Sequence, residues 1–255
     1  NSEYACTFLY NLCLFQANLL FTSLMIEEKS FLFNLENVTQ RIKDACDKSG
    51  RDMDGVTLLP VTKNWPVDAV RYCKNSKITL VGENRVQEAT SKMDLIDGVE
   101  WELIGHLQSN KAKQVVGRFS RIQTVDSSKL LKRLDVASLA SGVKTAILLQ
   151  VNAGEDPAKF GVSLADAPAL FMQALKCEGL QVDGLMTIAP FAPDDPSVSA
   201  KTFFRLRTLR DQLASESGLP LKVLSMGMSG DLEQAVAEGS TMIRVGSSLF
   251  GDRMV

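Results

Sequence analysis

The sequence has one histidine and five scattered cysteines among its 255 residues. No pair of cysteines has the spacing of metal ligands, and His106 stands alone, so we expect no metal site. An odd number of unpatterned cysteines is typical of a reducing compartment and not of a disulfide framework. These features predict a cytoplasmic protein.

A strong excess of charge of either sign is also missing. Lysine and arginine number 28 against 30 acidic residues, which gives a net charge of −2. Binding along a nucleic-acid backbone needs a basic surface, so we expect no nucleic-acid partner. Any anion site must therefore be local.

The first 24 residues lack lysine and arginine. A secretory signal begins with positive charge and a transit peptide is rich in arginine, so neither pattern is present. Asn11, Gln16 and Asn18 interrupt the apolar run, which weakens a membrane span, and we expect no membrane association. We interpret 1–24 as an extension and place one functional domain at 25–255, since no Pro/Gly/Ser-rich linker divides it; a targeting or anchoring segment is the alternative.

Short apolar runs alternate with helical patterns through the rest of the chain. The predicted strands are 56–61, 78–81, 101–104, 121–125, 145–151, 184–188, 221–224 and 241–245. The predicted helices between them are 67–73, 84–92, 109–116, 127–139, 164–175, 200–215 and 231–237. This alternation predicts an α/β fold with a parallel sheet buried on both faces.

Eight such units favour a (β/α)8 TIM-type barrel, with an open doubly wound sheet as the alternative. A further helix is predicted at 32–48, ahead of the first strand, because Phe33, Leu35, Val38, Ile42 and Ala45 recur at helical spacing. In helix 200–215, we expect core packing from three apolar residues: Phe203, Phe204 and Leu206.

In both architectures a ligand binds beyond the carboxyl ends of the strands. The last two strands lead into loops that contain Gly227, Ser229 and Gly230, then Gly246 and Ser247. Glycine lets a backbone approach an anion closely, and a helix start with serine offers N–H and hydroxyl donors. Two adjacent loops of this kind favour a phosphate site over ordinary helix caps.

Lys63 directly follows the first predicted strand. At the rim of an apolar barrel we expect its amine to be partly desolvated, which lowers its pKa and makes it nucleophilic. Such an amine forms a Schiff base with an aldehyde. Together with a phosphate site, this indicates a phosphorylated aldehyde, either pyridoxal phosphate or an aldolase-type sugar phosphate, and spacing does not choose between them.

An ordered series of motifs carries a family resemblance. The motifs are VTKNWP at 61–66, GENRVQE at 82–88, WELIGHLQSNK at 101–111, TVDS at 124–127, QVNAGEDPAKFG at 150–161, GLMTIAP at 184–190 and LSMGMSGDLEQAVAEGSTMIRVGSSLFGDR at 224–253. Over about residues 32–253 the chain resembles the pyridoxal phosphate homeostasis proteins, whose fold is like the N-terminal barrel of alanine racemase. Thr62 departs from the serine that is usual there.

The resemblance implies a binding set for pyridoxal 5′-phosphate: Lys63, Asn84, Met226, Ser229, Arg244, Gly246 and Ser247. It implies that Lys63 forms the internal Schiff base and that Arg244 faces the pyridine nitrogen. The two serines and Gly246 match the phosphate cradle, and Asn84 and Met226 match residues that line the ring.

The resemblance also implies a role in intracellular cofactor homeostasis and in delivery to apo-enzymes, which affects amino-acid and keto-acid balance. We expect no catalytic residues, because an arginine leaves the pyridine nitrogen unprotonated and makes the ring a poorer electron sink. No tyrosine falls in a strand-end motif, and we expect no second racemase domain after Val255, so the protein is expected to be a monomer. A weakly active amino-acid racemase or lyase is the alternative.

Overall fold

The computed structural model describes residues 27–251, so the interpreted extension at 1–24 lies outside the described residues. The strands are β1 (Thr57–Pro60), β2 (Leu80–Glu83), β3 (Glu100–Leu103), β4 (Arg121–Val125), β5 (Thr145–Gln150), β6 (Leu180–Met186), β7 (Val223–Ser225) and β8 (Met242–Val245). The α-helices are α2 (Glu28–Ser49), α3 (Val67–Asn75), α4 (Val86–Met93), α5 (Ala112–Val115), α6 (Ser128–Ser141), α7 (Ala167–Ala174), α8 (Pro196–Ser217), α9 (Leu232–Ala237) and α10 (Ser247–Phe250). Two short 3-10 helices are η1 (Met53–Gly55) and η2 (Ser109–Lys111).

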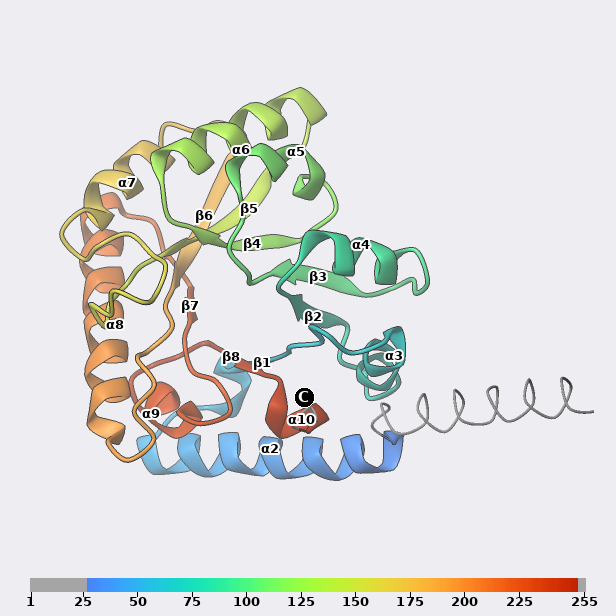
Figure 1. The fold of residues 1–255 in the computed structure, drawn as a ribbon. Helices are drawn as coiled ribbons and strands as arrows, with labels where there is room; N and C mark the ends of the chain where they lie inside the picture. Colours follow the sequence, from blue (N-terminus) through green and yellow to red (C-terminus); the bar gives the residue numbers. More distant parts are fainter. Residues whose placement is uncertain (1–26, 252–255) are drawn as a thin grey trace, which may run out of the picture.

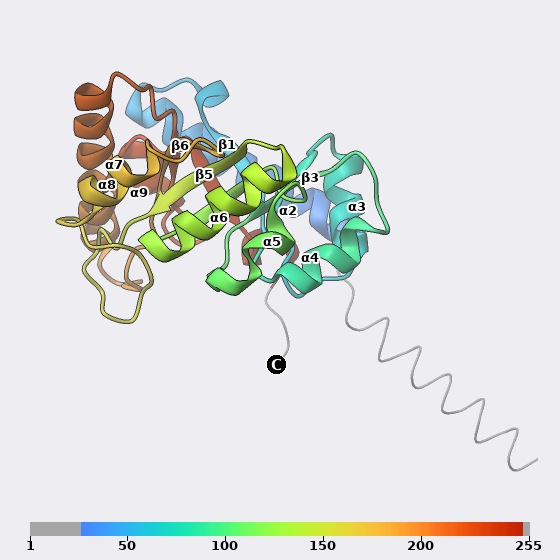
Figure 2. The ribbon, with the colours of Figure 1, turned by 90° about the horizontal axis from the view of Figure 1, so that it is seen from above.

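The strands form one parallel sheet in the order β1-β8-β7-β6-β5-β4-β3-β2, with helices outside the ring (Figure 1 and Figure 2). The two ends of this order meet just beyond β1 and β2. There Val61 bridges Gly82, and the Thr62 N–H donates to the Gly82 carbonyl at 3.0 Å. The predicted (β/α)8 barrel is therefore confirmed, and the open doubly wound sheet is excluded.

Most of the hydrophobic core lies between the strands and the helices. Ile122 of β4 and Leu134 of α6 are fully buried members of this core. The next residue of β4, Gln123, contacts Ser225 of β7 and Met242 of β8, neither of which adjoins β4 in the sheet. Because strand side chains alternate in direction, the barrel has an apolar outer layer and a partly polar inside.

Helix α2 is the predicted extra N-terminal helix, four residues longer at its start than expected. Its buried face contains Phe31, Val38 and Ile42, whereas Phe33 is 64% exposed. Phe33 lies off this face, because the apolar stripe begins at Phe31, four positions before the half-buried Leu35. None of the helices between residues 27 and 251 is both long and apolar enough to cross a membrane.

Most predicted elements are shifted by a few residues at their ends, and one strand start and one core residue differ most clearly. β6 begins at Leu180, whereas the pattern predicts a start at Gly184. Gly184 lies inside the strand at a shift of register, where an added Cβ would be 1.8 Å from the Val223 carbonyl oxygen. In α8, Phe203 and Leu206 are buried, but Phe204 is 50% exposed and carries Arg207 over its ring, so its prediction as core was wrong.

Candidate functional site

The carboxyl ends of β1 and β8 bring two predicted site residues to one edge of the barrel. Leu59 pairs with Arg244, and the Val61 N–H donates to the Val245 carbonyl at 2.8 Å. Lys63 follows two residues after Val61, in a turn. The residue is exposed.

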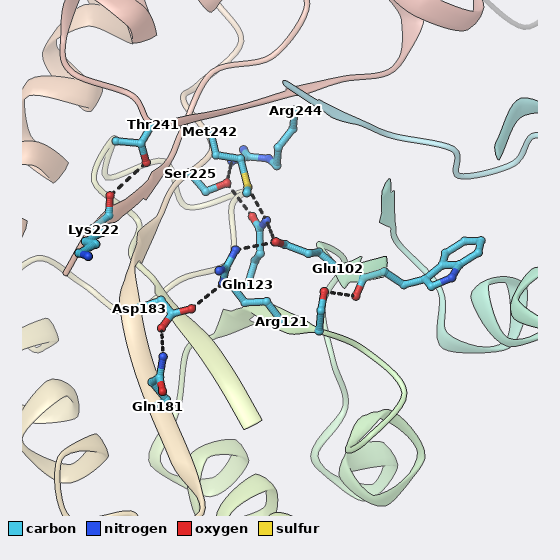
Figure 3. A network of polar contacts seen from close by, with 12 residues as sticks. Glu102, Arg121, Gln123, Gln181, Asp183, Lys222, Ser225, Thr241, Met242 and Arg244 are labelled. Carbon is cyan, nitrogen blue, oxygen red and sulfur yellow. Dashed lines mark hydrogen bonds and ion pairs between the residues drawn. The ribbon is translucent and has the colours of Figure 1, made fainter. Parts of the chain in front are cut away.

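Arg244 has the opposite environment, because it is 3% exposed and lies inside the barrel. Its guanidinium donates to the Ser225 hydroxyl at 2.8 Å (Figure 3). It also donates to the Thr187 carbonyl at 2.9 Å. Burial lowers the pKa of Arg244 to about 10, and the charges of Asp231 and Glu102 oppose this shift. The guanidinium therefore stays positively charged at neutral pH.

A chain of polar contacts continues from Arg244 through the inside of the barrel (Figure 3). Ser225 donates to the Gln123 side-chain oxygen at 2.6 Å, and the Gln123 amide donates to Glu102 at 2.5 Å. Glu102 also pairs with Arg121 at 2.6 Å. Burial raises the pKa of Glu102, although the positive charge of Arg121 works against this. Arg244 is therefore linked to Glu102 through Ser225 and Gln123.

The same network extends to the amino ends of the strands. Arg121, at the start of β4, also pairs with Asp183 of β6 at 2.9 Å, and Asp183 accepts from Gln181 at 2.7 Å. A cavity of about 360 Å³ lies beside it, lined by Asp54, Gly55, Thr57, Leu80, Arg121, Lys222, Val223, Thr241 and Met242. This cavity is at the end of the barrel opposite Lys63, so it is separate from the predicted site.

The two loops of the predicted phosphate site meet. The Ser248 backbone N–H donates to the Ser229 hydroxyl at 3.3 Å, which joins the loop after β7 to the loop after β8. Helix α2 supports the first loop, because Arg41 donates to the Ser229 carbonyl at 3.1 Å and pairs with Glu233 at 2.8 Å. Ser247 is exposed at the start of α10.

A glycine allows the loop after β7 to lie close to its neighbours, and the loop after β8 lies next to the end of β1. Gly227 has φ of 94°, and an added Cβ would be 2.4 Å from the Ala235 side chain. At Gly246, an added Cβ would be 3.5 Å from the Val61 carbonyl oxygen. The short distance from Gly246 to Val61 shows that the end of β8 lies next to the end of β1, which leads to Lys63.

Asn84 and Met226, the residues predicted to line the ring, have different environments. Asn84 is half-buried at the end of β2, where its carbonyl oxygen would be 2.0 Å from a Cβ on Gly105. Met226 has no exposed surface and belongs to the hydrophobic core, whereas Met228 is 37% exposed. The structure thus places Asn84 at the barrel mouth and Met226 beneath the surface of the loop after β7.

His106 lies at the rim, as expected for a residue of the third loop. Its side chain is 38% exposed, its Nδ1 is 3.5 Å from an Asp126 carboxylate oxygen, and its ring stacks on Phe160 at 4.1 Å between centroids. No group of three His, Cys, Asp or Glu residues within 27–251 is arranged to hold a metal ion.

Several polar residues of this region were not predicted. Gln123 and Glu102 continue the chain of contacts that starts at Arg244 and Ser225, and the Glu83–Lys92 pair lies next to the Lys63 turn. The available signal for the first pair was a polar residue within an otherwise apolar strand. The second pair joins a strand end to a helix nine residues later, and nothing in the local pattern indicates that contact.

The donor set at the mouth fits a phosphorylated pyridine aldehyde. It combines an exposed amine on Lys63, a buried cation on Arg244, and hydroxyl and backbone donors in two glycine-containing loops. An amine suits an aldehyde, a fixed cation suits a ring nitrogen acceptor, and such loops suit a phosphate.

Comparisons with solved structures agree with the fold. A structure described as an unknown protein from Bifidobacterium adolescentis has a TM-score of 0.84 at 31% identity, covering 89% of this chain and 98% of that one. PipY of Synechococcus elongatus PCC7942, solved with pyridoxal phosphate bound, has a TM-score of 0.72 at 39% identity, covering 77% and 93%. Alanine racemase of Clostridium difficile 630 is 14% identical with a TM-score of 0.73, which shows a shared fold only.

Sequence comparisons give the family. The family model for the alanine racemase N-terminal domain matches residues 33–254. The pyridoxal phosphate homeostasis protein of Aquifex aeolicus (strain VF5) is 36% identical over 221 residues, covering 86% of this chain and 96% of the relative. The protein of the same description from Pseudomonas aeruginosa is 37% identical over 222 residues, covering 86% and 94%. This chain therefore belongs to the pyridoxal phosphate homeostasis protein family, whose members share the alanine racemase N-terminal fold.

Proposed function

We propose that this protein binds pyridoxal 5′-phosphate at the mouth of the barrel, as a Schiff base on Lys63, and acts in intracellular homeostasis of that cofactor. The observation that carries the proposal is the pairing of β1 with β8, which brings an exposed amine and a buried guanidinium to one edge. PipY, which contains pyridoxal phosphate in one of its structures, and the family's common description support the choice of cofactor.

Each side chain has a defined part in this proposal. Lys63 would bond the aldehyde carbon through its side-chain nitrogen, with release of one water that takes the aldehyde oxygen and two amine protons. Arg244 donates to the pyridine nitrogen from a position fixed by Ser225 and Thr187. The loop residues Ser229, Gly246 and Ser247 bind the phosphate, and Asn84 lies against the ring, whereas Met226 is buried and supports the loop after β7 from below.

Arg244 also argues for a carrier in preference to an enzyme. When bound, the cofactor supplies an electron sink, which is weaker if its pyridine nitrogen is unprotonated. A guanidinium that stays charged donates a hydrogen bond to that nitrogen but does not transfer its proton, so the nitrogen stays unprotonated. We therefore propose that the protein holds the cofactor in the cytoplasm as a monomer and passes it to apo-enzymes, with no catalytic residues of its own.

A second function, a weakly active amino-acid racemase or lyase, is favoured by one observation. Racemisation needs acid/base groups on two faces of the substrate, and Lys63 supplies one of them. His106 at the rim, with its Nδ1 3.5 Å from an Asp126 carboxylate oxygen, is the candidate for the other. Tyr72, the tyrosine within the described range, instead lies on α3 with its ring 6.0 Å from that of Phe31.

Isotope exchange separates the two functions. The loaded protein is incubated with L- and D-amino acids in deuterium oxide, and loss of the α-proton is followed by NMR. The carrier predicts exchange no faster than free pyridoxal phosphate at the same concentration. Exchange that is faster, and that is lost in both Lys63→Ala and His106→Gln, would establish the enzyme.

Cofactor delivery is tested with an apo-enzyme and a phosphatase that destroys free pyridoxal phosphate. The loaded protein should reactivate the apo-enzyme at a phosphatase concentration that abolishes reactivation by the free cofactor. If the phosphatase abolishes both equally, the cofactor is passed through solution and the delivery part of the proposal is wrong.

A further inference from the structure

Three charged side chains lie behind the turn that carries Lys63. Lys92 of α4 is 2.6 Å from Glu83 at the end of β2 and 2.9 Å from Glu88 one helical turn earlier. The side chains of Lys92 and Glu83 are 7% and 0% exposed, and that of Glu88 is 21% exposed. We call these three residues the Lys92 cluster. The side of β2 that carries Gly82 faces the barrel interior, where it packs against Leu59. Because side chains alternate along a strand, the next residue, Glu83, and with it the Lys92 cluster, faces outward.

The Lys92 cluster binds the residues on both sides of Lys63. Lys92 Nζ donates to the Thr62 carbonyl at 2.8 Å, and the Thr62 hydroxyl donates to Glu83 at 2.7 Å. On the other side, the Asn64 backbone N–H donates to the Glu88 carboxylate. The backbone is thus held immediately before and immediately after Lys63, whose own side chain is exposed.

The turn needs this support because its conformation is unfavourable for most residues. Asn64 has φ of 63°, in the left-handed region that asparagine tolerates better than other residues with a Cβ. The Asn64 N–H contact with Glu88 favours this conformation, and the Thr62 contacts fix the residue at which the turn leaves β1. Without them, the turn is free to adopt more common backbone angles that point Lys63 elsewhere.

Stability alone does not account for the Lys92 cluster. A buried ion pair costs desolvation free energy, and apolar residues of similar volume often stabilise a protein equally well or better. Burial raises the pKa of Glu83 despite the charge of Lys92, and Glu83 Oε2 is buried with no hydrogen-bond partner within 27–251. What the ionic arrangement provides, and an apolar one would not, is directed hydrogen bonding to Thr62 and Asn64.

We propose that Lys92, Glu83 and Glu88 are positioning residues, which fix the Thr62–Asn64 backbone so that Lys63 Nζ meets the aldehyde carbon of pyridoxal 5′-phosphate. This inference rests on the proposed function, because it requires Lys63 to be the residue that bonds the cofactor. The three residues act through Lys63 and do not themselves touch the cofactor.

The test compares Glu88→Ala with Glu88→Gln. Alanine removes the acceptor for the Asn64 N–H, whereas glutamine keeps an oxygen there. We expect Glu88→Ala to slow adduct formation with pyridoxal 5′-phosphate about tenfold, as for loss of one hydrogen bond to a charged group, and Glu88→Gln to recover most of that loss. The rate is followed by stopped-flow absorption and by borohydride trapping.

A second probe separates positioning from a general loss of structure. Pyridoxamine 5′-phosphate has the ring and phosphate but no aldehyde, so its affinity should differ less than twofold between Glu88→Ala and the wild type. Glu238→Ala is the matched control, because Glu238 has a similarly buried side chain, 25% exposed, and pairs with Arg207 on the surface of the ring of helices. It should form the adduct at the wild-type rate.

The outcomes are distinct. A wild-type adduct on a residue other than Lys63 would overturn the proposed function and this inference together. An adduct on Lys63 that Glu88→Ala forms at the wild-type rate would overturn this inference alone. Equal losses for Glu88→Ala and Glu88→Gln, accompanied by an equal loss of pyridoxamine 5′-phosphate affinity, would also overturn it, since that is the pattern of general unfolding. Thermal denaturation of each variant accompanies the kinetics.

Discussion

Lys63 and Arg244 are two basic residues at one edge of the barrel with opposite surroundings. Lys63 is exposed on a turn, and the contacts described above hold its neighbours. Arg244 is 3% exposed on β8, and its own guanidinium is held by Ser225 and Thr187. The protein therefore fixes the side chain of Arg244, but at Lys63 it fixes only the neighbouring backbone.

The difference matches the tasks that we propose for the two residues. A hydrogen-bond donor works best when it is fixed in a water-excluded position, because no reorganisation is then needed on binding. An amine that must form and break a covalent bond needs access to the aldehyde and to water. Burial is thus useful for Arg244 and would hinder Lys63.

Lys63→Ala should give the largest effect on binding and almost none on stability. The variant should lose all borohydride-trappable cofactor, while its free energy of unfolding changes by less than about 0.5 kcal/mol, as for other exposed residues. Absorption spectroscopy and urea denaturation measure the two quantities. Lys176→Ala, an exposed lysine before β6, is the control and should keep full binding. Trapping that persists in Lys63→Ala would contradict the assignment.

Arg244→Met should reverse this pattern by reducing stability strongly even without cofactor. Removing one member of a buried charged network costs about 3–5 kcal/mol, because Glu102 and Asp231 lose a balancing charge. Urea denaturation of the cofactor-free protein measures the loss. Arg118→Met, at an exposed arginine, should change the unfolding free energy by less than about 0.5 kcal/mol. A loss at Arg244 as small as that at Arg118 would show that the interior network is not structural.

Glu102→Gln tests the electrostatics of the Arg244 network through pH. Burial raises the pKa of Glu102 in the folded state. The folded state is therefore stabilised fully at pH values below the ordinary glutamate pKa, and this stabilisation is lost as the pH rises through the raised pKa. Glutamine cannot ionise and avoids that loss. The unfolding free energy of Glu102→Gln, relative to the wild type, should therefore increase over this pH window in a urea series. A difference that decreases with pH would contradict the direction of the shift.

Ser247→Ala should have the smallest effect. Loss of one hydroxyl donor to the phosphate should weaken pyridoxal 5′-phosphate binding by roughly threefold to tenfold, which corresponds to about 1 kcal/mol. Binding of pyridoxal, which lacks the phosphate, should not change. Equal weakening for both ligands would place Ser247 outside the phosphate site, and Ser141→Ala on α6 serves as the control.

The sequence was sufficient to predict much of the fold, because alternating apolar strands and helices have strong periodicity. Residues just after parallel strands gather at one edge, so the pattern also predicted that Lys63 and the glycine-containing loops lie at the same end of the barrel. Arg244 was named only through the family resemblance. It did not reveal the Lys92 cluster, whose members come from a strand end and a neighbouring helix. Local pattern also misplaced Phe204, because a helical apolar residue one position off the stripe faces solvent.

Residues inside the barrel were equally hard to predict. Gln123 and Glu102 have partners on strands across the ring, and those distances depend on the closure and register of the whole sheet. A polar residue in an apolar strand indicates a buried partner but does not say which one.

The most direct test of the central claim is borohydride reduction of the protein after incubation with pyridoxal 5′-phosphate, followed by peptide mapping with mass spectrometry. The account predicts loss of the long-wavelength absorption on reduction and one dominant pyridoxyl adduct, on the peptide that contains Lys63. A protein that stays colourless and unmodified with excess cofactor, or an adduct located on another lysine, would contradict it.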